Sequence, residues 1–305
     1  MALNLTFRQL KVFESAARHL SYTRAAKELH LSQPGVSMQI KQLEEAIGLP
    51  LFEQIGKKMH LTNAGREIYI YSQSIGHLLD EAELVLEELK GGGSGKLAIS
   101  VATTASHFAT RLLAAFSQRY ENVTISLDIT NRESLQHQLT NNEPDLVIMG
   151  QPPEGVEVES EAFMVNPLVM IAPANHPLVA EQNIPLAHFE DVNFVVRESG
   201  SGTRSAIQRF FDEQAVSFHT GIEMSSNEAI KQAVEAGLGL GIVSIHTLEL
   251  ELETQRLAIL DVQNFPVQRH WHIVQRSGKR LTPVALAFKQ FVLEEAVKFI
   301  RLPET

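Results

Sequence analysis

The sequence contains no cysteine, which excludes disulfide bonds, thiolate nucleophiles and cysteine-ligated metals. No run approaches the roughly 20 apolar residues that a membrane-spanning helix needs. The first residues do not resemble a secretory signal either, because Arg and Lys interrupt their helically spaced apolar positions. These absences predict a cytoplasmic protein without a membrane partner. They disfavour the alternative of an exported solute-binding protein.

Catalytic signatures are also missing. There is no GxSxG nucleophile elbow and no HExxH zinc motif. The GxGxG of Gly237, Gly239 and Gly241 precedes a predicted strand instead of joining a strand to a helix, so it disfavours a dinucleotide site. His270 and His272 could share a metal, but no third ligand is close in the sequence. We therefore expect neither an enzyme nor a protein with a bound metal or cofactor.

Charge is unevenly distributed along the 305 residues, whose formal net charge is −10. Residues 1–66 contain nine Lys or Arg against five Glu, a balance of +4, whereas residues 67–305 carry −14. A basic N-terminal segment on an acidic body fits a protein in which only the first segment meets nucleic-acid phosphates.

Three short helices are predicted in the first 50 residues. Thr6 opens a Thr-x-x-Gln capping box, and Ser21 and Ser32 are N-cap residues for the second and third helices. Pro34 suits the first turn of the third helix, which Gly48 ends. The short connection between the second and third helices is typical of a helix-turn-helix.

Residues Leu51–Thr62 suit a two-stranded wing, because apolar ends flank a polar tip that contains Gly56, Lys57 and Lys58. The alternative for this segment alone is a plain surface loop. A winged helix-turn-helix over residues 1–61 is therefore the expected DNA-binding domain.

Residues 62–90 are expected to form one long helix. Apolar residues recur every three or four positions over more than three heptads, which favours pairing with a second helix over packing on the helix's own domain. These positions are Ala64, Ile68, Tyr71, Ile75, Leu78, Ala82, Val85 and Leu89. The glycine-rich residues 91–95 then suit a flexible hinge.

Strands and helices alternate after the hinge, which predicts an α/β domain with a parallel sheet over residues 96–305. We expect two lobes with a cleft between them. Lobe I should comprise about residues 96–163 and 267–305, and lobe II about residues 164–266.

Residues 7–65 resemble the LysR-type transcriptional regulators. The matching positions are Ala25-Ala26, Ser32-Gln33-Pro34, Ser37, Leu43-Glu44, Leu51-Phe52-Glu53, Leu61-Thr62 and Gly65. The resemblance extends to about residue 295. The segments IMGQPPEG, RESGSGTRSAIQRFF, SSNEAIKQAVEAGLGLGIVS and QRHWHIVQR are similar to the subgroup that regulates carbon-dioxide-fixation (RuBisCO, Calvin-cycle) operons.

This resemblance implies a winged helix-turn-helix, a dimerisation helix and a two-lobed effector domain like that of periplasmic binding proteins. It implies a homodimer that assembles into a homotetramer, bends DNA and has RNA polymerase as a further partner. The effector would be a phosphorylated metabolite or NADPH, and regulation of another metabolic operon stays an alternative. Two positions depart from the family pattern, because Gln54 and Met38 stand where many members carry Arg.

The third helix should enter the major groove of double-stranded DNA. A dimer presents two such helices, so the target should be an interrupted inverted repeat. The Gln33 amide can pair with adenine, and Pro34 can lie against a thymine methyl. The full set of predicted DNA contacts is Thr23, Arg24, Gln33, Pro34, Ser37, Gln39, Lys41, Lys57 and Lys58.

Hydroxyl, amide and basic side chains follow predicted strands and open predicted helices in the two lobes. Such positions favour an anion, because helix N-termini offer free N–H groups. The expected effector contacts are Thr103, Thr104, Ser106, His107, Asn131, Arg132, Ser201, Thr203 and Arg204.

Overall fold

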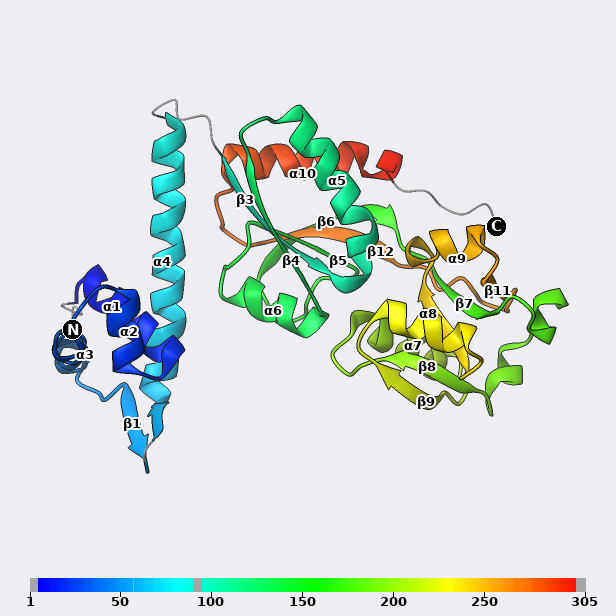
Figure 1. Cartoon of the computed structure of the whole chain (residues 1–305), viewed down its shortest axis with the longest axis horizontal. Coiled ribbons are helices and arrows are strands. Elements are labelled where there is room, and N and C mark those ends of the chain that lie inside the picture. Colours follow the sequence, from blue (N-terminus) through cyan, green and yellow to red (C-terminus); the bar gives the residue numbers. More distant parts are fainter. Residues whose placement is uncertain (1–4, 57, 90–94, 300–305) are drawn as a thin grey trace. The chain divides into compact units, whose positions relative to one another are not determined.

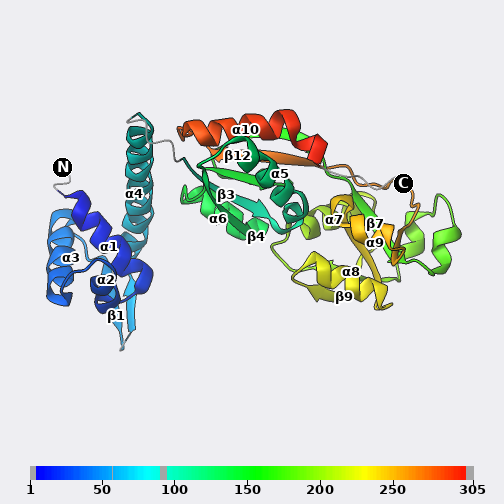
Figure 2. The same cartoon turned by 45° about the horizontal axis from the view of Figure 1, so that its top comes forward.

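The computed structural model describes residues 5–56, 58–89 and 95–299 (Figures 1 and 2). The chain divides into two compact units, residues 1–90 and 91–305, which are described separately. Lys57 and the predicted hinge, apart from Gly95, lie outside the described residues.

The N-terminal unit opens with three helices, α1 (Phe7–His19), α2 (Tyr22–Glu28) and α3 (Gln33–Ile47). Their ends follow the sequence signals. Thr6 and Gln9 form a complete capping box, and the hydroxyls of Ser21 and Ser32 accept hydrogen bonds from backbone N–H groups in the next turn. Gly48 ends α3 at a positive φ of 78°, a conformation that glycine adopts without strain. The apolar faces of the three helices meet in one core.

The predicted wing is an antiparallel hairpin of β1 (Phe52–Ile55) and β2 (Lys58–Leu61). Glu44 of α3 fixes its first strand, because one carboxylate oxygen accepts hydrogen bonds from Leu51 N at 2.7 Å and Phe52 N at 3.3 Å. The wing therefore has a fixed attachment to the third helix.

A single long helix, α4 (Asn63–Leu89), follows the wing. Thr62 caps it, with its hydroxyl 2.9 Å from Gly65 N. Ala64 and Ile68 pack against the core of the helix-turn-helix. The first two heptad positions are therefore used for packing within the N-terminal unit. Farther along, Tyr71 and Leu78 are 62% and 57% exposed. Among the stripe side chains that the structure describes, Tyr71, Ile75 and Leu78 are thus open to a partner.

Lobe I contains a five-stranded sheet in the order β4-β3-β5-β12-β6. Its strands are β3 (Lys96–Ala102), β4 (Thr124–Thr130), β5 (Leu146–Met149), β6 (Val158–Val165) and β12 (His270–Arg276). Helices α5 (Ser106–Arg119), α6 (Arg132–Thr140) and α10 (Pro283–Glu295) surround it (Figure 1). Strands β3, β4 and β5 are parallel, whereas β12 pairs antiparallel with both β5 and β6. The predicted parallel sheet is therefore mixed.

Lobe II repeats this plan with the strand order β11-β7-β10-β8-β9. Its strands are β7 (Leu168–Pro173), β8 (Asn193–Arg197), β9 (His219–Met224), β10 (Leu240–Ser244) and β11 (Leu257–Ile259). The helices are α7 (Gly202–Glu213), α8 (Asn227–Glu235) and the short α9 (Glu249–Glu253). Strands β8, β9 and β10 are parallel, and β7 runs antiparallel to both β10 and β11.

Two antiparallel crossings join the lobes. One leads from β6 to β7 and the other from β11 to β12. They bond to each other where Asn166 N donates to Arg269 O at 2.6 Å and Leu168 pairs with Val267. The side-chain oxygen of buried Asn166 accepts a 2.7 Å hydrogen bond from Ser244. This paired connection places Arg269, which neither sheet contains, between the lobes.

Candidate functional site

One face of α3 offers polar side chains to solvent. Gln33 and Lys41 are exposed and Ser37 is half-buried, and the spacing of four residues places the three along one side of the helix. Val36 and Ile40 on the opposite side are buried in the core. This division fits a helix that packs on its domain with one face and reads a groove with the other.

The remaining predicted DNA contacts lie around this face. Thr23 and Arg24 are exposed in the first turn of α2, Pro34 is exposed at the start of α3, and Lys58 is exposed on the wing. Gln39 is half-buried, with its amide 3.4 Å from Gln42. Met38 also faces solvent on α3, with 55% of its surface exposed. A groove-facing helix would therefore present this thioether among its polar side chains.

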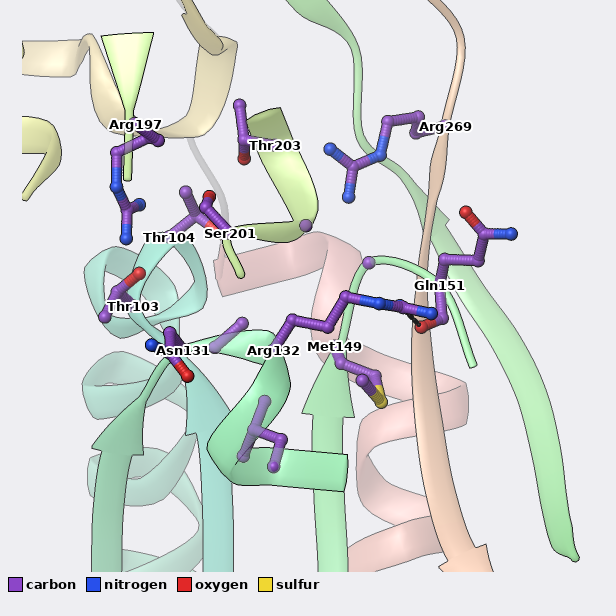
Figure 3. A pocket seen from close by; sticks show the side chains of 14 residues that line it. Thr103, Thr104, Asn131, Arg132, Met149, Gln151, Arg197, Ser201, Thr203 and Arg269 are labelled. Carbon is purple, nitrogen blue, oxygen red and sulfur yellow. Dashed lines mark hydrogen bonds between the residues drawn. The ribbon is translucent and has the colours of Figure 1, made fainter. Parts of the chain in front are cut away.

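A cleft lies between the lobes, at the carboxyl ends of β3, β4 and β5 and the N-terminus of α7 (Figure 3). It encloses about 370 Å³, including space open to solvent. Six predicted effector contacts line it, namely Thr103, Thr104, Asn131, Arg132, Ser201 and Thr203. The cleft thus brings together residues from separate parts of the sequence. This is expected, because the carboxyl ends of neighbouring parallel strands lie at the same edge of a sheet.

The polar groups of the cleft include two nearly buried threonines, Thr104 and Thr203, at 7% and 4% exposure. They come from opposite lobes. Ser201 occupies the N-cap position of α7, but its hydroxyl makes no capping hydrogen bond. The first turn of α7 therefore keeps N–H groups that can donate hydrogen bonds to an anion, in a region where the helix dipole is positive.

Arg269 lines the same cleft and was not among the predicted contacts. Its Nη1 is buried and has no hydrogen-bond partner. Burial and, to a smaller extent, the neighbouring charges of Arg132 and Arg209 lower the pKa of Arg269 to about 10. A Cβ on Gly150 would lie 2.0 Å from the Arg269 guanidinium, so glycine is required for this close approach. The result is an uncompensated cation between the lobes.

Two other arginines of the cleft differ in how they are paired. Arg197 is nearly buried, but the Glu198 carboxylate accepts its Nε and Nη2 hydrogen bonds at 2.7 and 2.8 Å. Arg132 donates to the carbonyl oxygens of Gln151 and Pro152. Carbonyl groups orient a guanidinium without cancelling its charge, so Arg132 adds to the positive potential.

Three predicted effector contacts are not among the lining residues of this cleft. The Ser106 hydroxyl donates to Thr103 O at 2.7 Å. His107 Nε2 lies 3.7 Å from Glu228 Oε1. Arg204 donates to the Thr220 hydroxyl at 2.6 Å and lies over the Phe218 ring. Each side chain therefore has a partner within the protein.

Within the described residues, no group of three or more His, Asp or Glu side chains is arranged to hold a metal ion. None of the described helices is long and apolar enough to cross a membrane.

Family models match nearly the whole chain. Residues 7–66 match the bacterial regulatory helix-turn-helix protein model of the lysR family, and residues 90–297 match the LysR substrate binding domain.

Relatives with assigned roles are similar over almost their full length. The chain is 57% identical to a RuBisCO operon transcriptional regulator of Allochromatium vinosum, covering 97% of this chain and 98% of the relative. It is 44% identical to the transcriptional activator CmpR of Synechocystis, covering 98% and 99% of the two chains.

Solved structures are similar to the separate parts and to the whole. The regulatory domain of Synechocystis CcmR in complex with 2-PG is 41% identical, covers 66% of this chain and 96% of that one, and has a TM-score of 0.64. Full-length CbnR bound to its target DNA is 21% identical, covers 94% and 99%, and has a TM-score of 0.66. The latter likeness concerns the fold alone.

Proposed function

The chain belongs to the LysR family of DNA-binding transcription regulators, and from this premise we propose that it controls a RuBisCO operon in response to a small anion. The identity of 57% to a RuBisCO operon regulator supports the choice of operon. The CcmR regulatory domain, which is 41% identical and is bound to 2-PG, supports a phosphorylated effector.

The uncompensated guanidinium of Arg269 is the observation that carries the effector proposal. A buried cation without a partner destabilises a protein, and an anion removes that cost by forming charge-assisted hydrogen bonds. Thr104 and Ser201 add hydroxyls from the two lobes, and α7 adds its N-terminal N–H groups. The arrangement favours the tetrahedral oxygens of a phosphate.

The proposed division of labour follows the chain. Residues 1–61 bind DNA, residues 62–90 dimerise the protein, residues 91–95 act as a hinge, and residues 96–305 bind the effector. Two DNA-binding heads in a dimer would bind an interrupted inverted repeat, with half-sites about one helical turn or a multiple of it apart. Two dimers would form the homotetramer, and RNA polymerase is a further proposed partner.

Calorimetry tests the effector proposal. The double variant Thr104→Val with Thr203→Val removes two hydroxyls from the cleft and keeps the side-chain shapes nearly unchanged. We expect 2-phosphoglycolate or NADPH to bind the wild type and to bind this variant about a hundredfold more weakly, since each of the two lost hydrogen bonds to a charged group costs on the order of 1.5–3 kcal/mol. Undiminished binding would place the effector elsewhere.

Selection of bound fragments from genomic DNA tests the operon. Fragments from RuBisCO promoters would support the proposal. Enrichment of promoters of unrelated metabolic genes would instead support the alternative of a LysR regulator with another target.

A further inference from the structure

A second polar pocket adjoins the effector cleft on the other side of Arg269. It lies between α7 of lobe II and β12 of lobe I and encloses about 740 Å³, including open space. The two pockets share Gly150, Gln151 and Arg269 as wall residues. The second pocket adds Arg209, Glu213 and His272, among others. One guanidinium therefore borders two neighbouring spaces.

Two polar atoms at this shared wall lack hydrogen-bond partners although they are buried. They are Nη1 of Arg269 and Nδ1 of His272, although the His272 imidazole also hydrogen-bonds to the backbone of His270 and Gly150. Buried polar atoms are nearly always paired, and the exceptions point to a missing water, ion or ligand. Arg209 is held beside them by a 3.0 Å hydrogen bond from its Nη2 to the Gln151 side-chain oxygen.

The charges around the pocket are predominantly positive. In the described part of the chain, no carboxylate forms an ion pair with the guanidinium of Arg132, Arg209 or Arg269. The three are close enough for Arg209 to lower the pKa values of the other two. The Glu213 carboxylate also lines the pocket, and since both Glu213 and Arg209 are exposed, water screens the charges of both residues.

We propose that Arg209, Arg269 and His272 form a second anion subsite beside the effector cleft. It would take a phosphate or carboxylate group through charge-assisted hydrogen bonds. The group is either the second anionic end of one effector or a separate ion. This inference rests on the proposed effector function, since it assigns the first subsite to the residues around Thr104 and Thr203.

Calorimetry on the full chain with three variants tests this subsite. Arg209→Gln replaces a charged guanidinium by a neutral amide, and His272→Gln separately replaces the imidazole by an amide. Arg204→Gln is the matched control, because Arg204 lies on the same helix and lines neither pocket. Thermal unfolding of each variant checks that the fold is retained.

The probes are inorganic phosphate, 2-phosphoglycolate and fructose 1,6-bisphosphate. If one effector spans both subsites, each two-ended probe should bind once per chain, and Arg209→Gln should weaken it by about tenfold while phosphate binding changes less. If a separate ion binds, phosphate should bind twice per chain in the wild type and once in Arg209→Gln. The Arg204→Gln control should behave as the wild type in both cases.

Wild-type affinity and stoichiometry for every probe in both Arg209→Gln and His272→Gln would overturn the second subsite. The proposed effector function would survive that result if the Thr104→Val, Thr203→Val variant still lost binding. A wild-type protein that bound none of the anions tested, NADPH included, would overturn both.

Discussion

The Arg269 side chain shows how a single residue can cost stability and provide function. Its guanidinium is largely removed from water and has no carboxylate partner among the described residues. The folded-state pKa of about 10 lies below the ordinary value of an arginine, so folding disfavours the charged form. This cost is fully present at neutral pH and disappears only as the pH rises from about 10 toward the ordinary pKa of an arginine.

Arg269→Met should therefore stabilise the effector-free protein at pH 7, while it weakens effector binding. We expect the free energy of unfolding to rise by about 1–3 kcal/mol, because methionine fills much of the same space without a buried charge. Denaturant unfolding with and without 2-phosphoglycolate measures both effects. A less stable variant would show that water or a local rearrangement already compensates the charge.

We expect the amide side chain of Gln33 to recognise bases in the DNA half-site. Gln33→Ala should relax base preference within each half-site and cost roughly 1–3 kcal/mol. Lys58→Ala, on the wing, should instead weaken binding to all sequences and flatten its dependence on salt. Binding titrations on matched and scrambled operators separate the two. Wild-type behaviour of both variants would mean that the domain docks differently.

The site residues that could be predicted are those whose position depends on their neighbours in the sequence. Thr103, Asn131 and Ser201 follow strands or precede helices, so their sequence neighbours indicate their place at the sheet edge. Arg269 has no such signal, because its burial depends on the chain returning from lobe II between β11 and β12. It lies within the segment QRHWHIVQR, which resembles the carbon-fixation subgroup, but periodicity could not assign it a role.

Helix α4 illustrates the same limit for a whole element. The heptad pattern predicted its length, but not that Ala64 and Ile68 pack against the helix-turn-helix core. Likewise, apolar runs identified most strands, whereas their direction depends on the two crossings. Strands β12 and β7 therefore run antiparallel to neighbours for which the alternation of strands and helices predicted parallel pairing.

The exposed stripe on α4 should be the dimer contact. Ile75 and Leu78 are 37% and 57% exposed in the single chain. Replacing both by Lys should give monomers that bind DNA poorly, because each buried aliphatic side chain contributes about 1.5–3 kcal/mol to association. Ile70→Lys is the control, since Ile70 is a similarly exposed residue outside the stripe. An intact dimer of the double variant in sedimentation would show that this stripe is not the dimer contact.

The effector unit as a whole has two lobes that touch beyond their crossings. Arg111 of α5 forms a 2.6 Å ion pair with Glu249 of α9, and His107 of α5 lies near Glu228 of α8. These pairs join lobe I to lobe II. Since Thr104 and Thr203 in the cleft also come from different lobes, effector binding and the ion pairs should favour the same relative position.

Exchange of the Arg111–Glu249 pair tests this coupling. Arg111→Glu and Glu249→Arg each place like charges across the lobe contact, so each should weaken effector binding by about two- to fivefold, the size expected for a partly exposed pair. The double exchange restores opposite charges and should recover most of the affinity, with a coupling energy of about 0.5–1 kcal/mol. Calorimetry on the four proteins gives this value directly. If the double exchange binds as weakly as the two single effects combined, the ion pair is a surface contact that does not help to hold the lobes around the effector.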